Sequence, residues 1–195
     1  MKEPLLYKVV KPPLKALFTL VFRPTVEGKE NIPTEGKIIL AGNHTSVFDC
    51  FTVAMSTKRC VHFMAKAELM NGIGKYIFPG LGIIPVDRST NGKQAVVSAE
   101  EYLNNGKLIA IFPEGTTNKT DDIMMPFKGG AVKIASDTDC DIVPFVISGK
   151  YKYFKKSVKI KFMPVMKVER GSLKAANKAL YETVRNELEK EYGVK

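Results

Sequence analysis

Four short apolar runs most constrain the fold of this chain. They occupy residues 37–41, 61–65, 107–112 and 142–147. Strands buried on both faces of a parallel sheet have this length and this unbroken apolar character. Segments with helical patterns lie between and after them, at residues 51–55, 92–104, 129–136 and 173–192. Apolar strands that alternate with helices predict an α/β fold, with a central, mostly parallel, buried sheet flanked by helices.

One domain accounts for most of the chain. A length of 195 residues suffices for a single sizeable core. The composition, 45% hydrophobic and 26% charged, is typical of a globular protein rather than a disordered one. Residues 158–162 alternate apolar and other side chains, which predicts a half-exposed strand. Because we find no linker, repeat or low-complexity tract, we expect one folded domain over residues 25–195 and a distinct segment before it.

Residues 1–24 form that segment and combine apolar with basic side chains. The apolar residues recur at helical spacing in two groups, Leu5, Leu6, Val9 and Val10, then Leu14, Leu17, Phe18 and Val21. Pro12 and Pro13 lie between the groups, which predicts two short helices with a break. No apolar run reaches the ~20 residues of a spanning helix. We therefore interpret the segment as an anchor at the membrane interface; the alternative is two ordinary helices packed on the core.

The charge of the chain predicts an anionic partner. Lys plus Arg is 30 and Asp plus Glu is 20, a net charge of +10, which favours nucleic acid, anionic lipid or a phosphorylated substrate. Residues 150–168 contain seven lysines and no acid, with Tyr151, Tyr153 and Phe154 among them. Nucleic-acid surfaces have this composition, and so do strand edges protected by lysine. The apolar N-terminal segment favours anionic membrane lipid over nucleic acid.

The cysteines and histidines argue against disulfides and metals. Cys50, Cys60 and Cys140 have no close C-x-x-C spacing, which fits a reducing compartment. His44 and His62 have no Cys or His partner at ligand spacing, so we expect no metal site. With the N-terminal segment, these observations predict a membrane-associated protein on the cytoplasmic face.

His44 and Asp49 are the first candidates for catalysis. A histidine acts as a general base when a carboxylate fixes its tautomer and stabilises the imidazolium. Residues five apart on a regular helix lie roughly 140° apart in projection, so these two meet only across a turn. We expect His44 before a helix and Asp49 in its first turn. Thr45 and Ser46 suit the N-cap position. Alone, the spacing is also typical of a capping turn with a hydrogen-bonded histidine.

Two further segments suit a phosphorylated alcohol. The strand at 107–112 runs into Pro113, Glu114 and Gly115, at the strand end where open α/β sheets bind ligands. Glu114 is suited to accept a hydrogen bond from a substrate hydroxyl, and Gly115 allows close backbone approach. Arg88 offers a planar fork that binds phosphate. The alternatives are a turn with a solvated glutamate and a surface ion pair.

These segments together, in this order, resemble the glycerolipid acyltransferase family, of the lysophosphatidic acid acyltransferase type. The resemblance runs from about residue 38 to 147, and its motifs are Asn43-His44-x-x-x-x-Asp49, Gly82-x-x-x-Val86-Asp87-Arg88, Phe112-Pro-Glu-Gly-Thr116 and Ile142-Val-Pro144. Two shorter stretches also look like family positions, Ala65-Lys66-x-Glu68-Leu69 and Phe127-Lys128-x-Gly130.

The resemblance implies a reaction without metal or other cofactor. His44, oriented by Asp49, would remove the proton from the free hydroxyl of lysophosphatidic acid. The oxygen would attack the thioester of acyl-CoA or acyl carrier protein, giving phosphatidic acid in phospholipid biosynthesis. The implied substrate-binding residues are Arg88 for the phosphate, Lys66 and Lys128 as auxiliary phosphate contacts, Glu114, Gly115 and Thr116 for the acceptor, and Pro144 for the acyl site.

Two departures from the family pattern lie where the acceptor would bind. Thr117 and Asn118 stand where many members carry Arg and then Ser, and Pro85 stands where many carry Phe. One alternative is therefore another acceptor, such as glycerol-3-phosphate or another lyso-lipid. A second is a non-catalytic protein that binds the membrane surface. A third is a thiol hydrolase that uses Cys50, which is disfavoured because the adjacent Asp49 raises the pKa of a thiol.

Overall fold

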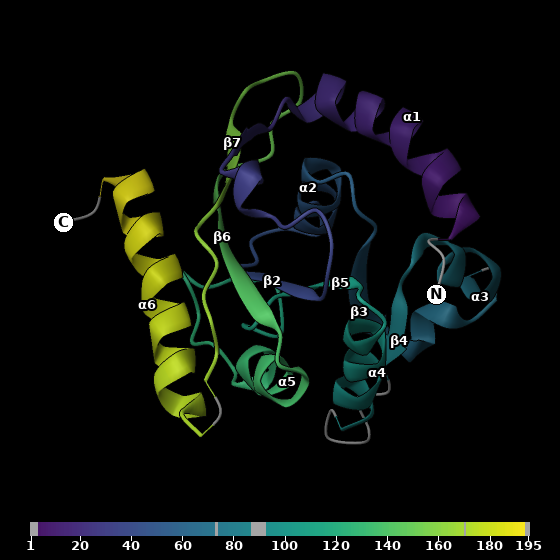
Figure 1. Cartoon of the computed structure of the whole chain (residues 1–195). Helices are drawn as coiled ribbons and strands as arrows, with labels where there is room; N and C mark the ends of the chain where they lie inside the picture. The colour runs from purple at the N-terminus through teal and green to yellow at the C-terminus, as the bar shows by residue number, and fades with distance from the viewer. Residues whose placement is uncertain (1–3, 73, 87–92, 170, 194–195) are drawn as a thin grey trace.

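The structure is a computed structural model that describes residues 4–72, 74–86, 93–169 and 171–193. Its centre is a seven-stranded sheet in the order β1-β7-β6-β2-β5-β3-β4 (Figure 1). The strands are β1 Thr25–Glu27, β2 Ile38–Gly42, β3 Val61–Lys66, β4 Ile84–Val86, β5 Leu108–Ile111, β6 Asp141–Gly149 and β7 Val158–Phe162. Among the described strands, β6 and β7 pair antiparallel and the other neighbours pair parallel. The predicted α/β fold with a mostly parallel sheet is confirmed.

Helices cover both faces of the sheet (Figure 1). They are α1 Leu5–Phe22, α2 Asp49–Ser56, α3 Gly74–Ile77, α4 Lys93–Asn104, α5 Gly130–Thr138 and α6 Leu173–Tyr192, with 3₁₀ turns at Lys29–Asn31, Ala67–Met70 and Pro79–Leu81. Strand β2 is buried on both faces because its side chains alternate between two cores. Ile39 and Ala41 pack in the core under α4, α5 and α6. Ile38 and Leu40 pack in the core under α2.

The N-terminal segment forms one continuous helix, α1, so the predicted break is wrong. Pro12 and Pro13 lie inside it, although each removes a backbone donor and clashes with the preceding turn. Contacts on both sides of the prolines hold the helix. The Tyr7 hydroxyl donates to the carbonyl of Arg59 (3.3 Å), and Phe18 and Phe22 are buried against α2. In the described part of the chain, every helix is too short or too polar to cross a bilayer.

The loops that carry the candidate residues leave the same edge of the sheet. Strands β2 and β5 run parallel with Ala41 opposite Ile111, so their carboxyl ends coincide. Residues 43–48 follow β2, and residues 112–117 follow β5. Gly42 ends β2 at a point where a Cβ atom would lie 2.2 Å from a backbone oxygen of β6, so only glycine permits this close approach. The site is therefore expected at the edge where parallel sheets bind ligands.

Strand β7 is the half-exposed strand that the sequence predicts, but its lysines do not form a free basic face. Lys159 forms ion pairs with Glu27 of β1 and Glu191 of α6, both at 2.9 Å. Lys161 forms an ion pair with Glu187 of α6 at 2.5 Å. The lysine-rich stretch therefore divides into a strand paired with acids and a separate loop between β6 and β7.

Candidate active site

His44 and Asp49 meet across the predicted turn. Asp49 is the first residue of α2, and its Oδ2 lies 3.0 Å from Nδ1 of His44. The expected placement of Asp49 in the first turn of a helix is confirmed. The expectation that Thr45 or Ser46 caps the helix is wrong: Phe48 occupies the N-cap position, without a side-chain cap. The carboxylate of Asp49 instead bonds back to the turn before the helix.

Backbone and side-chain donors surround the Asp49 carboxylate. Its Oδ2 accepts hydrogen bonds from the backbone N–H of Thr45 (2.6 Å) and of Ser46 (2.8 Å). Its Oδ1 accepts from the Tyr151 hydroxyl (2.8 Å), which lies 2.7 Å from the hydroxyl of Thr52. Asp49 is fully buried, and no described lysine or arginine forms an ion pair with it. Fixed backbone and hydroxyl dipoles therefore satisfy both oxygens of this carboxylate.

The ring of His44 presents one nitrogen to the cavity. Because a carboxylate only accepts hydrogen bonds, Asp49 requires the proton on Nδ1 of His44, and the lone pair is then on Nε2. The ring stacks on Phe112, with centroids 4.0 Å apart and planes at 17°. Its side chain is 15% exposed. The geometry therefore leaves Nε2 as the basic atom that can reach a substrate.

Glu114 fixes the backbone of His44. Its Oε1 accepts a hydrogen bond from the backbone N–H of His44 (2.6 Å), and its Oε2 accepts from Met125 N–H (3.0 Å). The side chain is buried, and this burial raises the pKa of the Glu114 carboxyl. The backbone N–H of Asn118 closes the turn from the other side by donating to the His44 carbonyl (2.7 Å). A contact between Glu114 and the acceptor hydroxyl stays a prediction, because both carboxylate oxygens are used within the protein.

A cavity of about 630 Å³ opens beside His44. Its wall is mostly apolar and includes Cys50, Phe63, Met64, Val86, Ala95, Ala110, Ile111, Phe112 and Ala131. Its polar lining comes from Thr116, Thr117 and Lys128. Gly115 has φ +76°, and a Cβ there would lie 2.6 Å from Nζ of Lys128. This glycine therefore allows the lysine to lie against the loop at the rim of the cavity.

The remaining sequence-predicted residues fall in three places. Arg88 lies outside the described residues, although Val86 and Ala95 on either side line the cavity. Lys66 is the last residue of β3, and its side chain lies outside the described part of the structure. Pro144 is buried in β6 opposite Ala41 and is not among the described residues that line the cavity.

Sequence reasoning missed the role of Tyr151. We interpreted this residue as part of a basic, aromatic membrane or nucleic-acid surface. The structure instead packs it, half-buried, against Phe22 and Phe48 with its hydroxyl on Asp49. Burial and the Asp49 charge raise the pKa of this phenol, which keeps it protonated as a donor. No local signal reveals the contact, because 102 residues separate the partners.

Cys50 lines the cavity but is a poor nucleophile. Burial, followed by the charge of Asp49, raises the pKa of the Cys50 thiol to about 12. A thiol with that pKa is protonated at neutral pH, and only the thiolate attacks a carbonyl. The thiol-hydrolase alternative is therefore disfavoured by the site itself. Among the described residues, no group of three or more Cys, His, Asp or Glu side chains is placed to bind a metal.

The sequence of the chain is similar to those of known acyltransferases. A sequence profile described as Acyltransferase matches residues 23–148. The chain is 31% identical over 147 residues to "1-acyl-sn-glycerol-3-phosphate acyltransferase" of Bacillus subtilis, covering 74% of this chain and 72% of the relative. It is 30% identical over 136 residues to the protein of that name from Borreliella burgdorferi, covering 68% of this chain and 54% of the relative. The chain spans about half the length of several other relatives, such as the human alpha form.

A solved structure extends the similarity to the whole fold. The crystal structure of the 1-acyl-sn-glycerophosphate (LPA) acyltransferase PlsC from Thermotoga maritima superposes with a TM-score of 0.76. The two sequences are 25% identical, and the match covers 95% of this chain and 79% of that one.

Proposed function

Since the chain belongs to the acyltransferase family, we propose that it moves a fatty acyl group from a thioester to the free hydroxyl of lysophosphatidic acid, which gives phosphatidic acid. The observation that carries this proposal is the His44–Asp49 pair, 3.0 Å apart beside the cavity. The relatives are named for this acceptor. The donor is acyl-CoA or acyl carrier protein.

His44 is the general base of the proposed reaction. Nε2 takes the proton of the acceptor hydroxyl as its oxygen forms a bond to the thioester carbonyl carbon. The resulting tetrahedral intermediate expels the donor thiolate when the carbon–sulfur bond breaks, and the imidazolium of His44 returns the proton to sulfur. Asp49 stabilises the imidazolium throughout, because its charge is already surrounded by donors.

The cavity suits a substrate with a charged head and an apolar tail. Lys128 and Thr116 line it on the polar side, and an ammonium group binds phosphate as a point charge. We propose Arg88 as the main phosphate ligand and Lys66 and Lys128 as auxiliary ones. Gly115 and Thr116 position the acceptor, and the apolar wall holds an acyl chain. Pro144 shapes that wall only through the neighbouring strand, and Glu114 acts by holding His44.

Helix α1 is the proposed membrane anchor. Its inner face is buried, whereas Leu5, Val9, Leu17 and Leu20 on other faces are each more than half exposed. No Asp or Glu occurs in residues 4–26, so the anchor carries positive charge that suits anionic lipid. We therefore propose a peripheral membrane enzyme on the cytoplasmic face. Replacing the four residues with serine should release the protein from anionic vesicles while leaving the buried face intact.

The test of the proposed chemistry is the His44→Ala variant. Thioester consumption in the presence of lysophosphatidate should fall by a factor on the order of 10³ or more, because the general base alone contributes 10²–10⁴. Far-ultraviolet circular dichroism should match the wild-type protein, and thermal unfolding should remain cooperative at a lower temperature, because the substitution removes a mostly buried ring that stacks on Phe112 and bonds to Asp49. Retained turnover in a folded variant would remove His44 from its proposed role.

The second candidate function is acyl transfer to another acceptor. It is favoured by the departures from the family pattern at Thr117, Asn118 and Pro85, which lie where the acceptor would bind. A panel of lysophosphatidate, glycerol-3-phosphate and other lyso-lipids, each with acyl-CoA and with acyl carrier protein donors, separates the alternatives. The highest kcat/KM with lysophosphatidate would support the proposal. A higher value with another alcohol would make that alcohol the acceptor and leave the acyl-transfer reaction unchanged. Vesicle binding without any thioester cleavage would instead support a non-catalytic membrane-binding protein.

A further inference from the structure

The loop between β6 and β7 presents aromatic and basic side chains to solvent. Tyr153 is 69% exposed and Phe154 is 62% exposed. The lysines of this loop are also exposed, and they are Lys150, Lys152, Lys155 and Lys156. Within the described chain, none of these four forms an ion pair. The loop thus differs from β7, whose lysines are paired with acids.

The backbone holds Phe154 outward at a conformational cost. Phe154 has φ +59°, a left-handed conformation that is unfavourable for a bulky residue. Its N–H donates to the carbonyl of Val21 in α1 (2.5 Å), which fixes the residue in place. Burial of the ring does not offset this cost, because most of the side chain remains in water. Strain of this kind is typical of positions that serve binding.

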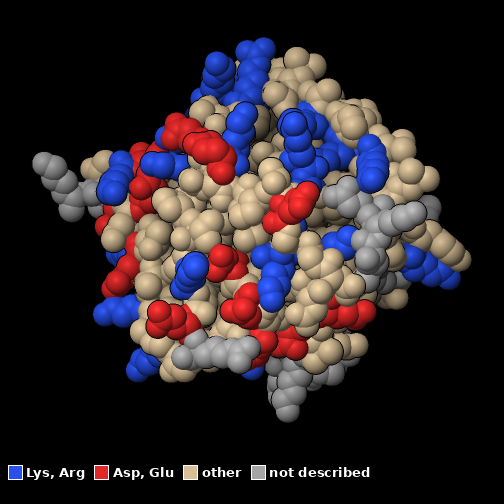
Figure 2. Space-filling model, in the orientation of Figure 1, with Lys and Arg blue, Asp and Glu red and all other residues tan. Residues whose placement is uncertain are grey.

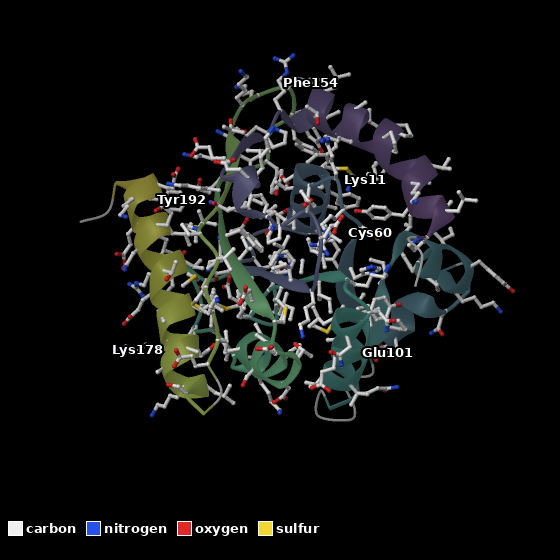
Figure 3. All side chains as sticks on the ribbon, viewed as in Figure 1. Lys11, Cys60, Glu101, Phe154, Lys178 and Tyr192 are labelled. Carbon is white, nitrogen blue, oxygen red and sulfur yellow. The ribbon has the colours of Figure 1, made fainter. Side chains whose placement is uncertain are left out.

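The loop and the end of α1 form one continuous surface. The ring of Tyr153 contacts Phe22 of α1, with centroids 5.5 Å apart, and the bond from Phe154 to Val21 lies beside this contact. Figure 1 shows the loop next to the C-terminal end of α1, and Figure 3 places Phe154 at the outer end of the loop. Lys and Arg side chains project from the same end of the molecule in Figure 2.

We propose that this loop is a second contact with an anionic bilayer, alongside the exposed side of α1. Aromatic rings favour the boundary between headgroups and acyl chains, and lysines are attracted to anionic headgroups. Residues 150–157 contain four lysines and no acid, so the positive charge of the loop is complementary to an anionic bilayer. The inference rests on the proposed membrane location of the enzyme and adds a contact that α1 alone does not supply.

The loop also connects the membrane contact with the catalytic pair. Tyr151, at the base of the loop, donates to Asp49 (2.8 Å), two residues before Tyr153. The proposed membrane-binding residues are therefore neighbours in the chain of Tyr151, which contacts the residue that orients His44. We expect the loop to matter for an acceptor embedded in vesicles and not for a soluble one.

Vesicle co-sedimentation of the full chain tests the aromatic part. The probe is vesicles of equal parts phosphatidylglycerol and phosphatidylcholine. The Tyr153→Ser/Phe154→Asn variant should lower the partition coefficient roughly tenfold, since two partly inserted rings are lost. Asn tolerates the left-handed conformation, so the fold should survive. The control is Val97→Ser on α4, an equally exposed apolar residue (63%) on the opposite face of the sheet, which should bind like the wild-type protein.

A matched pair of lysine variants tests the charged part. The Lys152→Gln/Lys155→Gln variant should lower binding to the same vesicles about fivefold per lysine. Lys174→Gln/Lys178→Gln removes equal charge from the N-terminal part of α6, where Figure 3 shows Lys178 far from Phe154, and should have little effect. Binding that is unchanged in both loop variants overturns the proposal. So does tight binding of duplex DNA at physiological salt that the lysine variant abolishes, because the partner is then nucleic acid.

Activity separates this inference from the proposed function. With a short-chain, water-soluble lysophosphatidate, the loop variants should turn over at the wild-type rate, whereas with a vesicle-embedded acceptor they should be slower by the factor lost in binding. Absence of turnover in the wild-type protein would refute the proposed function and leave the vesicle result standing. Equal rates of wild-type and loop variants on embedded acceptor, with equal vesicle binding, would refute the loop contact alone.

Discussion

The turn that carries His44 and the rest of the cavity wall are held by different kinds of interaction. On the turn, the two carboxylates near the base have fixed partners: Asp49 accepts from four donors besides the His44 ring, and Glu114 accepts from two backbone N–H groups. The wall is mostly apolar and its polar members, such as Lys128, are exposed.

The difference assigns separate tasks to the two regions. A base must be preorganised, because reorganisation during the reaction would raise the barrier. An acyl chain and a glycerol head need volume and a charge to bind, and neither demands fixed hydrogen bonds in the empty protein. Substitutions on the turn should therefore lower kcat, whereas substitutions on the wall should change KM or nothing.

The largest effect that sharpens this comparison is expected for Asp49→Asn. The amide keeps the shape but not the charge that stabilises the imidazolium, so kcat should fall about 10²- to 10⁴-fold. Thermal stability should fall by about 1–3 kcal/mol, because Asn has one acceptor oxygen whereas the N–H groups of Thr45 and Ser46 and the Tyr151 hydroxyl all donate to the buried carboxylate. Steady-state kinetics and calorimetry measure both effects. Asp137→Asn on α5 is the control, and an unchanged kcat in a folded Asp49→Asn variant would contradict the account.

Glu114→Gln should have the next largest effect. Gln has one acceptor oxygen, whereas the backbone N–H groups of His44 and Met125 both need an acceptor. One buried donor is therefore left unpaired, at a cost of about 1–3 kcal/mol in unfolding free energy. The displaced His44 backbone should lower kcat roughly ten- to a hundredfold, with KM nearly unchanged, since small errors in position are costly.

The control for this prediction is Glu101→Gln, an exposed glutamate on α4. It should match the wild-type protein in stability and turnover. If Glu114→Gln raised KM alone, Glu114 would instead contact the acceptor, as the sequence suggested.

The buried strands could be predicted from the sequence, because each one is a single run of apolar residues adjacent in the chain. The four expected buried strands all occur, as β2, β3, β5 and β6. Among the described strands, β1 and β4 were missed, because each has only three residues and no pattern of its own. The break expected at Pro12 was wrong, since long-range contacts of Tyr7 and Phe18 override the local preference.

The site follows the same division between local and distant information. His44 and Asp49 lie five residues apart, so their spacing alone predicts a turn. The partners that hold them come from elsewhere: Glu114 is 70 residues from His44, and Tyr151 is 102 from Asp49. Glu114 carries a motif and was identified, with a different role, whereas the part of Tyr151 that matters is one hydroxyl, which no local pattern marks.

Tyr151→Phe should produce a smaller loss on the turn. Asp49 keeps its bonds to the backbone and to His44 but loses the shorter of the two hydrogen bonds on Oδ1. A single hydrogen bond to a charged group is worth about 1.5–3 kcal/mol, and the Thr45 hydroxyl, 3.4 Å from Oδ1, retains part of it, so kcat should fall roughly three- to tenfold. KM for a soluble acceptor should not change. Tyr153→Phe, in the same loop but exposed, is the control; equal kinetics in the two variants would exclude a positioning role for Tyr151.

Cys50→Ala should have the smallest effect and tests the wall directly. Cys50 adjoins Asp49 in sequence and lines the cavity, so it is the residue of the wall best placed for covalent chemistry. Burial and the neighbouring carboxylate raise the pKa of its thiol to about 12, so at neutral pH almost no thiolate forms. Turnover of Cys50→Ala should stay within about twofold of wild type, since a partly buried thiol lost from a cavity wall leaves the His44 network in place. Alkylation of the wild-type protein by iodoacetamide should be slow at neutral pH and should accelerate only as the pH approaches 12. Loss of turnover in Cys50→Ala, together with rapid alkylation at neutral pH, would show that a residue of the cavity wall takes part in the chemistry. Catalysis would then not be confined to the turn that carries His44.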